Sequence, residues 1–156
     1  MPATSATSKH LIGPALLIQI VHKQSKAVAW MQSVSEPRCV LSHLAIAIVK
    51  STIDEQFPQG PHRDSWHQAL RLTITRMTEK GTPLVDVSPA TLDLYPLYRR
   101  HEPLQFHREG HPPESIGQDV RLLIATAESQ GLVYTEFDDL YLQQLAALNR
   151  VAVQIL

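Results

Sequence analysis

The stretch from Ser115 to Leu140, SIGQDVRLLIATAESQGLVYTEFDDL, indicates the fold class of this 156-residue chain. Apolar residues recur at helical spacing over 116–127, which predicts a helix with one buried face. Gly131 stands where a helix commonly ends in a left-handed residue. The apolar run 132–135 then predicts a short strand. The stretch is therefore a helix–strand unit, as expected of an α/β protein.

Polar residues mark both ends of this unit. Ser115 and Gln118 have the spacing of a capping box, so we expect the helix to begin at Ser115. Asp119 lies near the helix start, and Asp138 and Asp139 follow the strand. Ligands of open α/β sheets bind beyond the carboxyl ends of the strands, so these acids are candidate functional residues.

The rest of the chain repeats this alternation of helices and strands. Helix starts are predicted at Ser25, Ser42, Ser65 and Ser88, the last supported by a following proline. Pro96 predicts a kink or an early helix end. Strands are expected over 11–12, 38–41, 84–87 and 151–155, a loop over 54–64, and further helices over 15–21 and 140–148. The pattern predicts a mostly parallel central sheet between helix layers.

Composition places the chain among ordinary globular proteins. A hydrophobic content of 44% and a formal charge of -1 predict one domain with a real core and no global attraction to nucleic acid. Cys39 is the single cysteine, which excludes an internal disulfide and favours a reduced, cytoplasmic setting. We expect a flexible tail over 1–9 and one domain over 10–156. The apolar run 11–21 is too short to span a bilayer.

Three passages resemble the PIN domain, the nuclease fold of VapC-type toxins in toxin–antitoxin pairs. They are LLIATAESQGL (122–132), LVDVSP (84–89) and PRCVLS (37–42). The resemblance implies a three-layer α/β/α fold over the whole domain. It also implies a homodimer, an antitoxin-like partner and an RNA substrate.

The family's chemistry uses carboxylates at one sheet edge to hold Mg²⁺ or Mn²⁺, which activates water for phosphodiester hydrolysis. The corresponding positions here are Gly13, Ile48, Val120 with Asp119 beside it, and Asp138 or Asp139. Glycine and isoleucine cannot ligate a hard cation. The resemblance thus implies a degenerate site.

Two functions follow from this pattern. One is a PIN-like module without catalysis that binds RNA or an antitoxin-like protein. The alternative is an active endoribonuclease with a rearranged site, in which Asp119, Asp138 and Asp139 are catalytic and Asp119 and Asp138 hold the metal. A further carboxylate at the sheet edge, from Glu114 or Glu136, would favour the nuclease if it converged with Asp119. An apolar floor left there by Gly13 and Ile48 would favour the module.

Each candidate also has an ordinary structural explanation. Asp119 suits the positive end of a helix dipole, and Asp138 or Asp139 suits a helix N-cap. Arg99, Arg100 and Arg108 are candidate RNA contacts or plain surface charge. Histidines 101, 107 and 111 share one loop, where solvated side chains are favoured over a zinc site.

Overall fold

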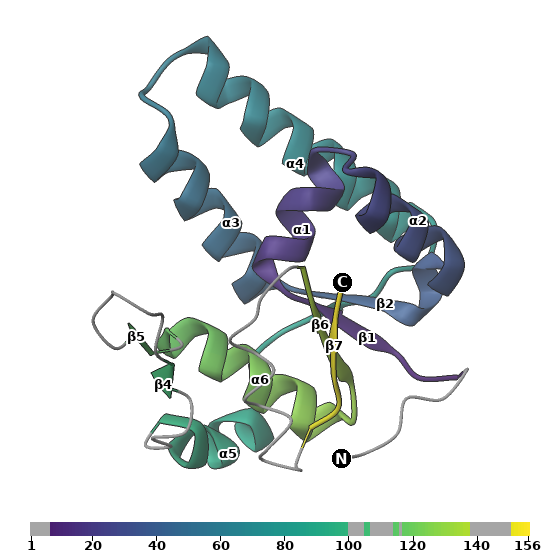
Figure 1. Cartoon of the computed structure of the whole chain (residues 1–156), viewed down its shortest axis with the longest axis vertical. Coiled ribbons are helices and arrows are strands. Elements are labelled where there is room, and N and C mark those ends of the chain that lie inside the picture. The colour runs from purple at the N-terminus through teal and green to yellow at the C-terminus, as the bar shows by residue number, and fades with distance from the viewer. Residues whose placement is uncertain (1–6, 100–104, 107–113, 116, 138–150) are drawn as a thin grey trace.

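The computed structural model is an α/β structure with one helix layer on each face of a parallel sheet (Figure 1). It describes residues 7–99, 105–106, 114–115, 117–137 and 151–156. The strands are β1 (His10–Ile12), β2 (Cys39–Ser42), β3 (Leu84–Val85), β4 (Gln105–Phe106), β5 (Glu114–Ser115), β6 (Val133–Glu136) and β7 (Val153–Ile155). The helices are α1 (Pro14–Val21), α2 (Ser25–Val34), η1 (a 3₁₀ turn, Glu36–Arg38), α3 (His43–Gln56), α4 (Pro61–Glu79), α5 (Pro89–Arg99) and α6 (Gln118–Gln130).

The main sheet has five strands in the order β3-β2-β1-β6-β7, and every neighbouring pair is parallel. β1 is central and lies between β2 and β6. Strands added after β1 extend the sheet first to one side and then, from β6 onward, to the other. This reversal places a topological switch point between β1 and β6.

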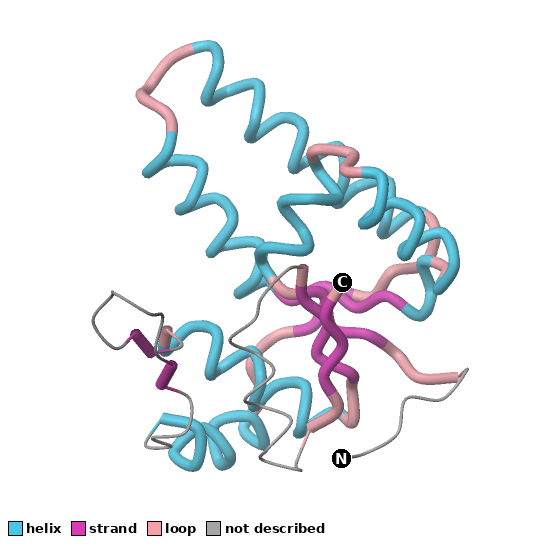
Figure 2. The backbone as a smooth tube through the Cα atoms, in the orientation of Figure 1, coloured by secondary structure: helices cyan, strands magenta, loops and turns pink. Residues whose placement is uncertain are grey.

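Two cores cover the two faces of the sheet, as the separate helix layers in Figure 2 suggest. The larger packs α1, α2, α3 and α4 on one face, with Leu16, Leu17 and Leu70 almost fully buried. The other packs α5 and α6 against the sheet around Leu123 and Tyr134. The predicted three-layer α/β/α arrangement is confirmed.

Several helix boundaries follow the predicted signals. The Ser42 hydroxyl accepts a bond from the Leu44 amide, and Ser88 caps α5 through the Thr91 amide. Gly131 ends α6 with φ 65°, in the left-handed region.

Other predicted boundaries are wrong. α6 begins after Gly117, which is its N-cap, whereas Ser115 lies two positions earlier and pairs in β5. α4 begins at Pro61 rather than at Ser65, since a proline at the first helical position favours that start. Much of the predicted loop over 54–64 is consequently helical, and α5 continues through Pro96 to Arg99.

Three further predictions concern the tail, the last helix and a membrane span. Ser8 and Lys9, in the predicted tail, accept bonds from the Arg38 guanidinium and the Val133 amide through their carbonyls. The predicted helix over 140–148 lies outside the described residues. Across the part of the chain that the structure describes, no helix is long and apolar enough to cross a membrane.

Candidate functional site

The carboxyl edge of the sheet is where the functional residues were expected. β1 ends there at Ile12 and is followed by Gly13, which is the N-cap of α1. β6 ends beside it with Glu136, because Ile12 pairs with Thr135 and the Gly13 amide donates to the Thr135 carbonyl at 2.8 Å. The switch point of the fold is therefore occupied by Gly13 and Glu136.

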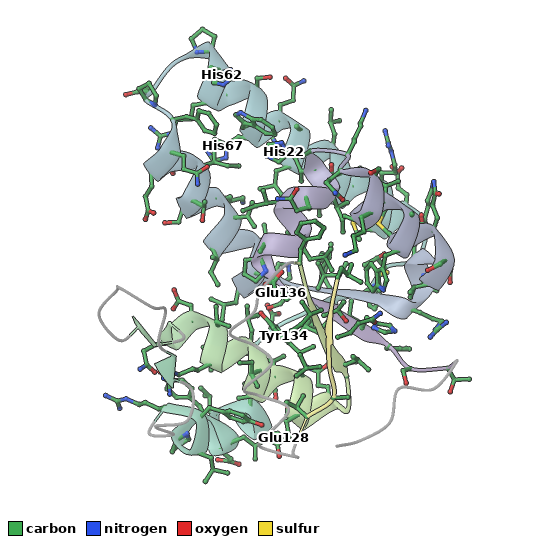
Figure 3. All side chains as sticks on the ribbon, viewed as in Figure 1. His22, His62, His67, Glu128, Tyr134 and Glu136 are labelled. Carbon is green, nitrogen blue, oxygen red and sulfur yellow. The ribbon has the colours of Figure 1, made fainter. Side chains whose placement is uncertain are left out.

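The Glu136 side chain turns inward at this edge and is only 3% exposed. Its Oε1 accepts from the amides of Leu16 at 2.5 Å and Phe137 at 3.0 Å. Its Oε2 accepts from the Ala15 amide at 3.3 Å and the Tyr134 hydroxyl at 3.5 Å. Figure 3 shows Glu136 where β6 meets α1, with Tyr134 on the same strand. The carboxylate thus joins the end of β6 to the first turn of α1.

Gly13 is the residue that makes room for this carboxylate. A Cβ atom at position 13 would lie 2.2 Å from Glu136 Oε2 and 2.5 Å from Cδ. The backbone angles of Gly13 are φ -74° and ψ 163°, which any residue adopts. A side chain at position 13 would therefore require the Glu136 carboxylate to move, whereas the backbone angles allow any residue there.

The other positions implied by the resemblance differ in burial and in residue type. Asp119 lies exposed in the first turn of α6, where the helix dipole accounts for a carboxylate. Ile48 and Val120 are half-buried and pack against the core of the α5–α6 face. Asp138 and Asp139 lie outside the described residues, as does the side chain of Glu114.

A second pair of polar side chains lies farther along the same edge. His43, the first residue of α3, places Nδ1 2.6 Å from Oδ1 of Asp86, just after β3. Both side chains are well exposed, so solvent screens the pair and it adds little to stability.

The described residues do not fit a metal centre. Within the described ranges, no three His, Cys, Asp or Glu side chains gather closely enough to hold an ion. The buried carboxylate at the edge is already surrounded by hydrogen-bond donors. The metal positions predicted at Asp119 and Asp138 therefore stay predictions, without a described cluster around them.

Of the three predicted RNA-contact arginines, Arg99 is among the described residues. It is exposed on the last turn of α5, whereas Arg100 and Arg108 lie outside the described residues. The neighbouring Arg121 of α6 is 4% exposed and donates through Nη1 to the Tyr98 carbonyl at 2.6 Å and the Arg99 carbonyl at 3.4 Å. Burial lowers the pKa of Arg121 from its usual value. The Tyr98 hydroxyl also donates to Glu128.

Histidines gather elsewhere than the sequence suggested. His62 and Trp66 contact Phe57 near the outer ends of α3 and α4 (Figure 3). His22 contacts Trp66, with their ring centroids 4.2 Å apart. Histidines 101, 107 and 111, considered for zinc, lie outside the described residues.

A groove runs between α1, α2 and α4 on the opposite helix layer from α5 and α6. Its volume is about 570 Å³. The apolar part of its lining comes from Ile20, Val28, Met31 and Met77, and the charged part from Lys23, Arg76, Lys80 and Glu36. Glu36 lies 3.5 Å from Lys80 and balances its charge. The charges of Lys23 and Arg76 remain, so the groove carries an excess of positive charge. The sequence does not predict this groove, because its lining comes from helices that are brought together only in the folded chain.

Comparison with known proteins identifies the fold. No family model matches the sequence, and no curated protein matches it. Among solved structures, FitAcB from Neisseria gonorrhoeae matches with 19% identity and TM-score 0.64, over 93% of this chain and 96% of that one. VapBC2 from Rickettsia felis, bound to a promoter DNA fragment, matches with 11% identity and TM-score 0.67, over 94% and 98%.

DNA-bound VapBC from Salmonella typhimurium matches similarly, with 12% identity and TM-score 0.65 over 95% and 98% of the two chains. At such identities the likeness concerns the fold and extends over nearly the whole chain. The chain therefore has the PIN-like fold.

Proposed function

We propose that this chain is a PIN-like interaction module of a VapC-type toxin–antitoxin lineage, with a lost or weakened metal-dependent ribonuclease site. The observation that supports loss of the site is the state of Glu136. Its two oxygens accept from four donors, and a carboxylate offers about four lone-pair sites. A cation at this edge would have to displace bonds that are already made.

The proposed partner is an antitoxin-like protein segment that lies in the groove between α1, α2 and α4. Solved neighbours are complexes named FitAB and VapBC, which favours a protein partner. The groove is lined by apolar side chains and by three cations against one carboxylate. This combination suits an amphipathic segment with acidic residues beside its apolar face. RNA contact through Arg99, Arg100 and Arg108 and formation of a homodimer stay predictions.

Calorimetric titration with Mn²⁺ tests the loss of the metal site. We expect no saturable binding at millimolar metal and no cleavage of RNA under the same conditions. Asp119→Asn is the informative variant, and Asp93→Asn, an exposed acid on α5, is its matched control. Saturable binding that disappears in Asp119→Asn and persists in Asp93→Asn would instead support the alternative, an active endoribonuclease built on Asp119, Asp138 and Asp139.

A fluorescent, acidic, amphipathic helical peptide tests the groove. Arg76→Glu should weaken its binding about three- to tenfold, because it reverses a charge at the groove wall. Arg71→Glu changes an exposed arginine of the same helix that does not line this groove and should have no such effect. Equal loss in both variants would mean that the peptide responds to net charge and would contradict a specific groove.

A further inference from the structure

We infer that Glu136 is the N-cap of α1 supplied from a different strand, and that it has replaced the acid expected at position 13. α1 begins with Pro14, so Ala15 and Leu16 occupy the second and third helical positions. An N-cap side chain normally accepts from the amides of these two positions. Glu136 accepts from both, although it lies 121 and 120 positions away in the sequence.

Position 13 is where the side chain that accepts these bonds would ordinarily stand. Gly13 holds the N-cap position of α1 and makes no side-chain cap bond, since it has no side chain. Aspartate is among the strongest N-cap residues, so an acid at position 13 would cap α1 from within the local sequence. In this chain the capping oxygen comes from β6 instead, and the missing Cβ of Gly13 leaves the space for it.

This arrangement explains why the edge holds a buried carboxylate although the described residues there do not gather into a cation site. The partial positive charge at a helix N-terminus favours an acid there whichever residue supplies it. An acid at position 13 and Glu136 would compete for the same space and the same amides. The inference deepens the proposed function and rests on it for the absence of metal chemistry. It predicts that an acid at position 13 and Glu136 cannot both occupy the start of α1.

Thermal unfolding of four variants tests this exclusion. Glu136→Ala removes the acceptor from the Ala15, Leu16 and Phe137 amides and should lower Tm by roughly 10 °C. Gly13→Asp should also lower Tm, because its side chain meets the Glu136 carboxylate. The double variant Gly13→Asp/Glu136→Ala should regain much of the loss of Glu136→Ala. Gly13→Ala/Glu136→Ala should not regain it to the same extent, since alanine offers no capping oxygen.

Gly117 provides the matched control. It is the N-cap of α6, has φ -57° and ψ 152°, and has no atom within 4 Å of an added Cβ. Gly117→Asp should change Tm by the same amount with Glu136 present or replaced by alanine. If Gly13→Asp does not fold, Gly13→Ala gives a milder version of the same clash, and its Tm should fall only while Glu136 is present.

Two results of thermal unfolding would overturn the inference. One is a Gly13→Asp variant as stable as the original chain. The other is a double variant with aspartate at position 13 that is no more stable than its counterpart with alanine there. Mn²⁺ titration of Glu136→Gln separates this inference from the proposed function. Binding by the original chain that is lost in Glu136→Gln makes Glu136 a metal ligand and refutes both, whereas binding retained in Glu136→Gln refutes the proposed loss of the metal site alone.

Discussion

Replacing Arg121 by methionine should destabilise the α5–α6 layer. The change keeps an unbranched apolar side chain and removes the guanidinium, whose Nη1 donates to the Tyr98 carbonyl at 2.6 Å. The carbonyls of Tyr98 and Arg99 are among the last of α5, where a cation also interacts favourably with the helix dipole. Replacing the guanidinium therefore removes the donor that these two carbonyls share at the end of α5.

The expected magnitude combines gains and losses. A hydrogen bond from a charged donor contributes about 1.5–3 kcal/mol, and the dipole term contributes about 0.3–1 kcal/mol. Burial opposes them, since Arg121 is 4% exposed and its pKa is lowered chiefly by desolvation. We therefore expect a net loss of about 2 kcal/mol in the free energy of unfolding, or a Tm lower by about 4–8 °C.

Urea unfolding followed by circular dichroism measures this loss. Arg71→Met is the control, because Arg71 is exposed on α4 and its replacement should change stability by less than about 0.5 kcal/mol. A loss below about 0.5 kcal/mol in Arg121→Met as well would refute the assignment of a capping role to Arg121.

Two further predictions concern buried titratable groups. Burial, and then the charge of Arg38, lowers the pKa of His10 below its usual 6.5, so the fold disfavours the protonated ring. Stability should be fully present above pH 6.5 and fall as pH decreases toward the folded pKa, with a weaker dependence in His10→Gln; equal Tm–pH slopes in the two proteins would contradict this. Burial, and then the charge of Glu36, raises the pKa of Cys39 to about 12, so the native thiol should resist iodoacetamide at pH 8 and react once urea unfolds the chain. Rapid alkylation of the native protein would contradict that.

Much of the fold could be predicted because its signals are local. Ser42, Gly131 and the pair Ser88–Pro89 each mark a helix boundary through atoms within a few residues, and all three predictions are confirmed. Competing local signals account for the errors. Ser115 has the spacing of a cap but pairs in β5 instead.

The candidate site was predictable only in part, because its chemistry depends on contacts between distant segments. The resemblance implies that Gly13 stands where the family has an acid, and the sequence offers Glu136 as a further carboxylate at the sheet edge. These two residues meet only because β6 pairs beside β1. The same pairing brings the carboxylate of Glu136 to the amides of α1 that donate to it. No spacing in the sequence carries that information.

The central place of β1 has a consequence for synthesis on the ribosome. One neighbour of β1 emerges early, as β2, but the other arrives only with β6; His10 and Thr135, which bond across this pair, are 125 positions apart. Until then one edge of the middle strand is unpaired, and the amides at the start of α1 lack the Glu136 carboxylate. Nascent chains that stop before β6 should therefore be prone to aggregation and proteolysis, and the α/β/α layers should become stable late in translation.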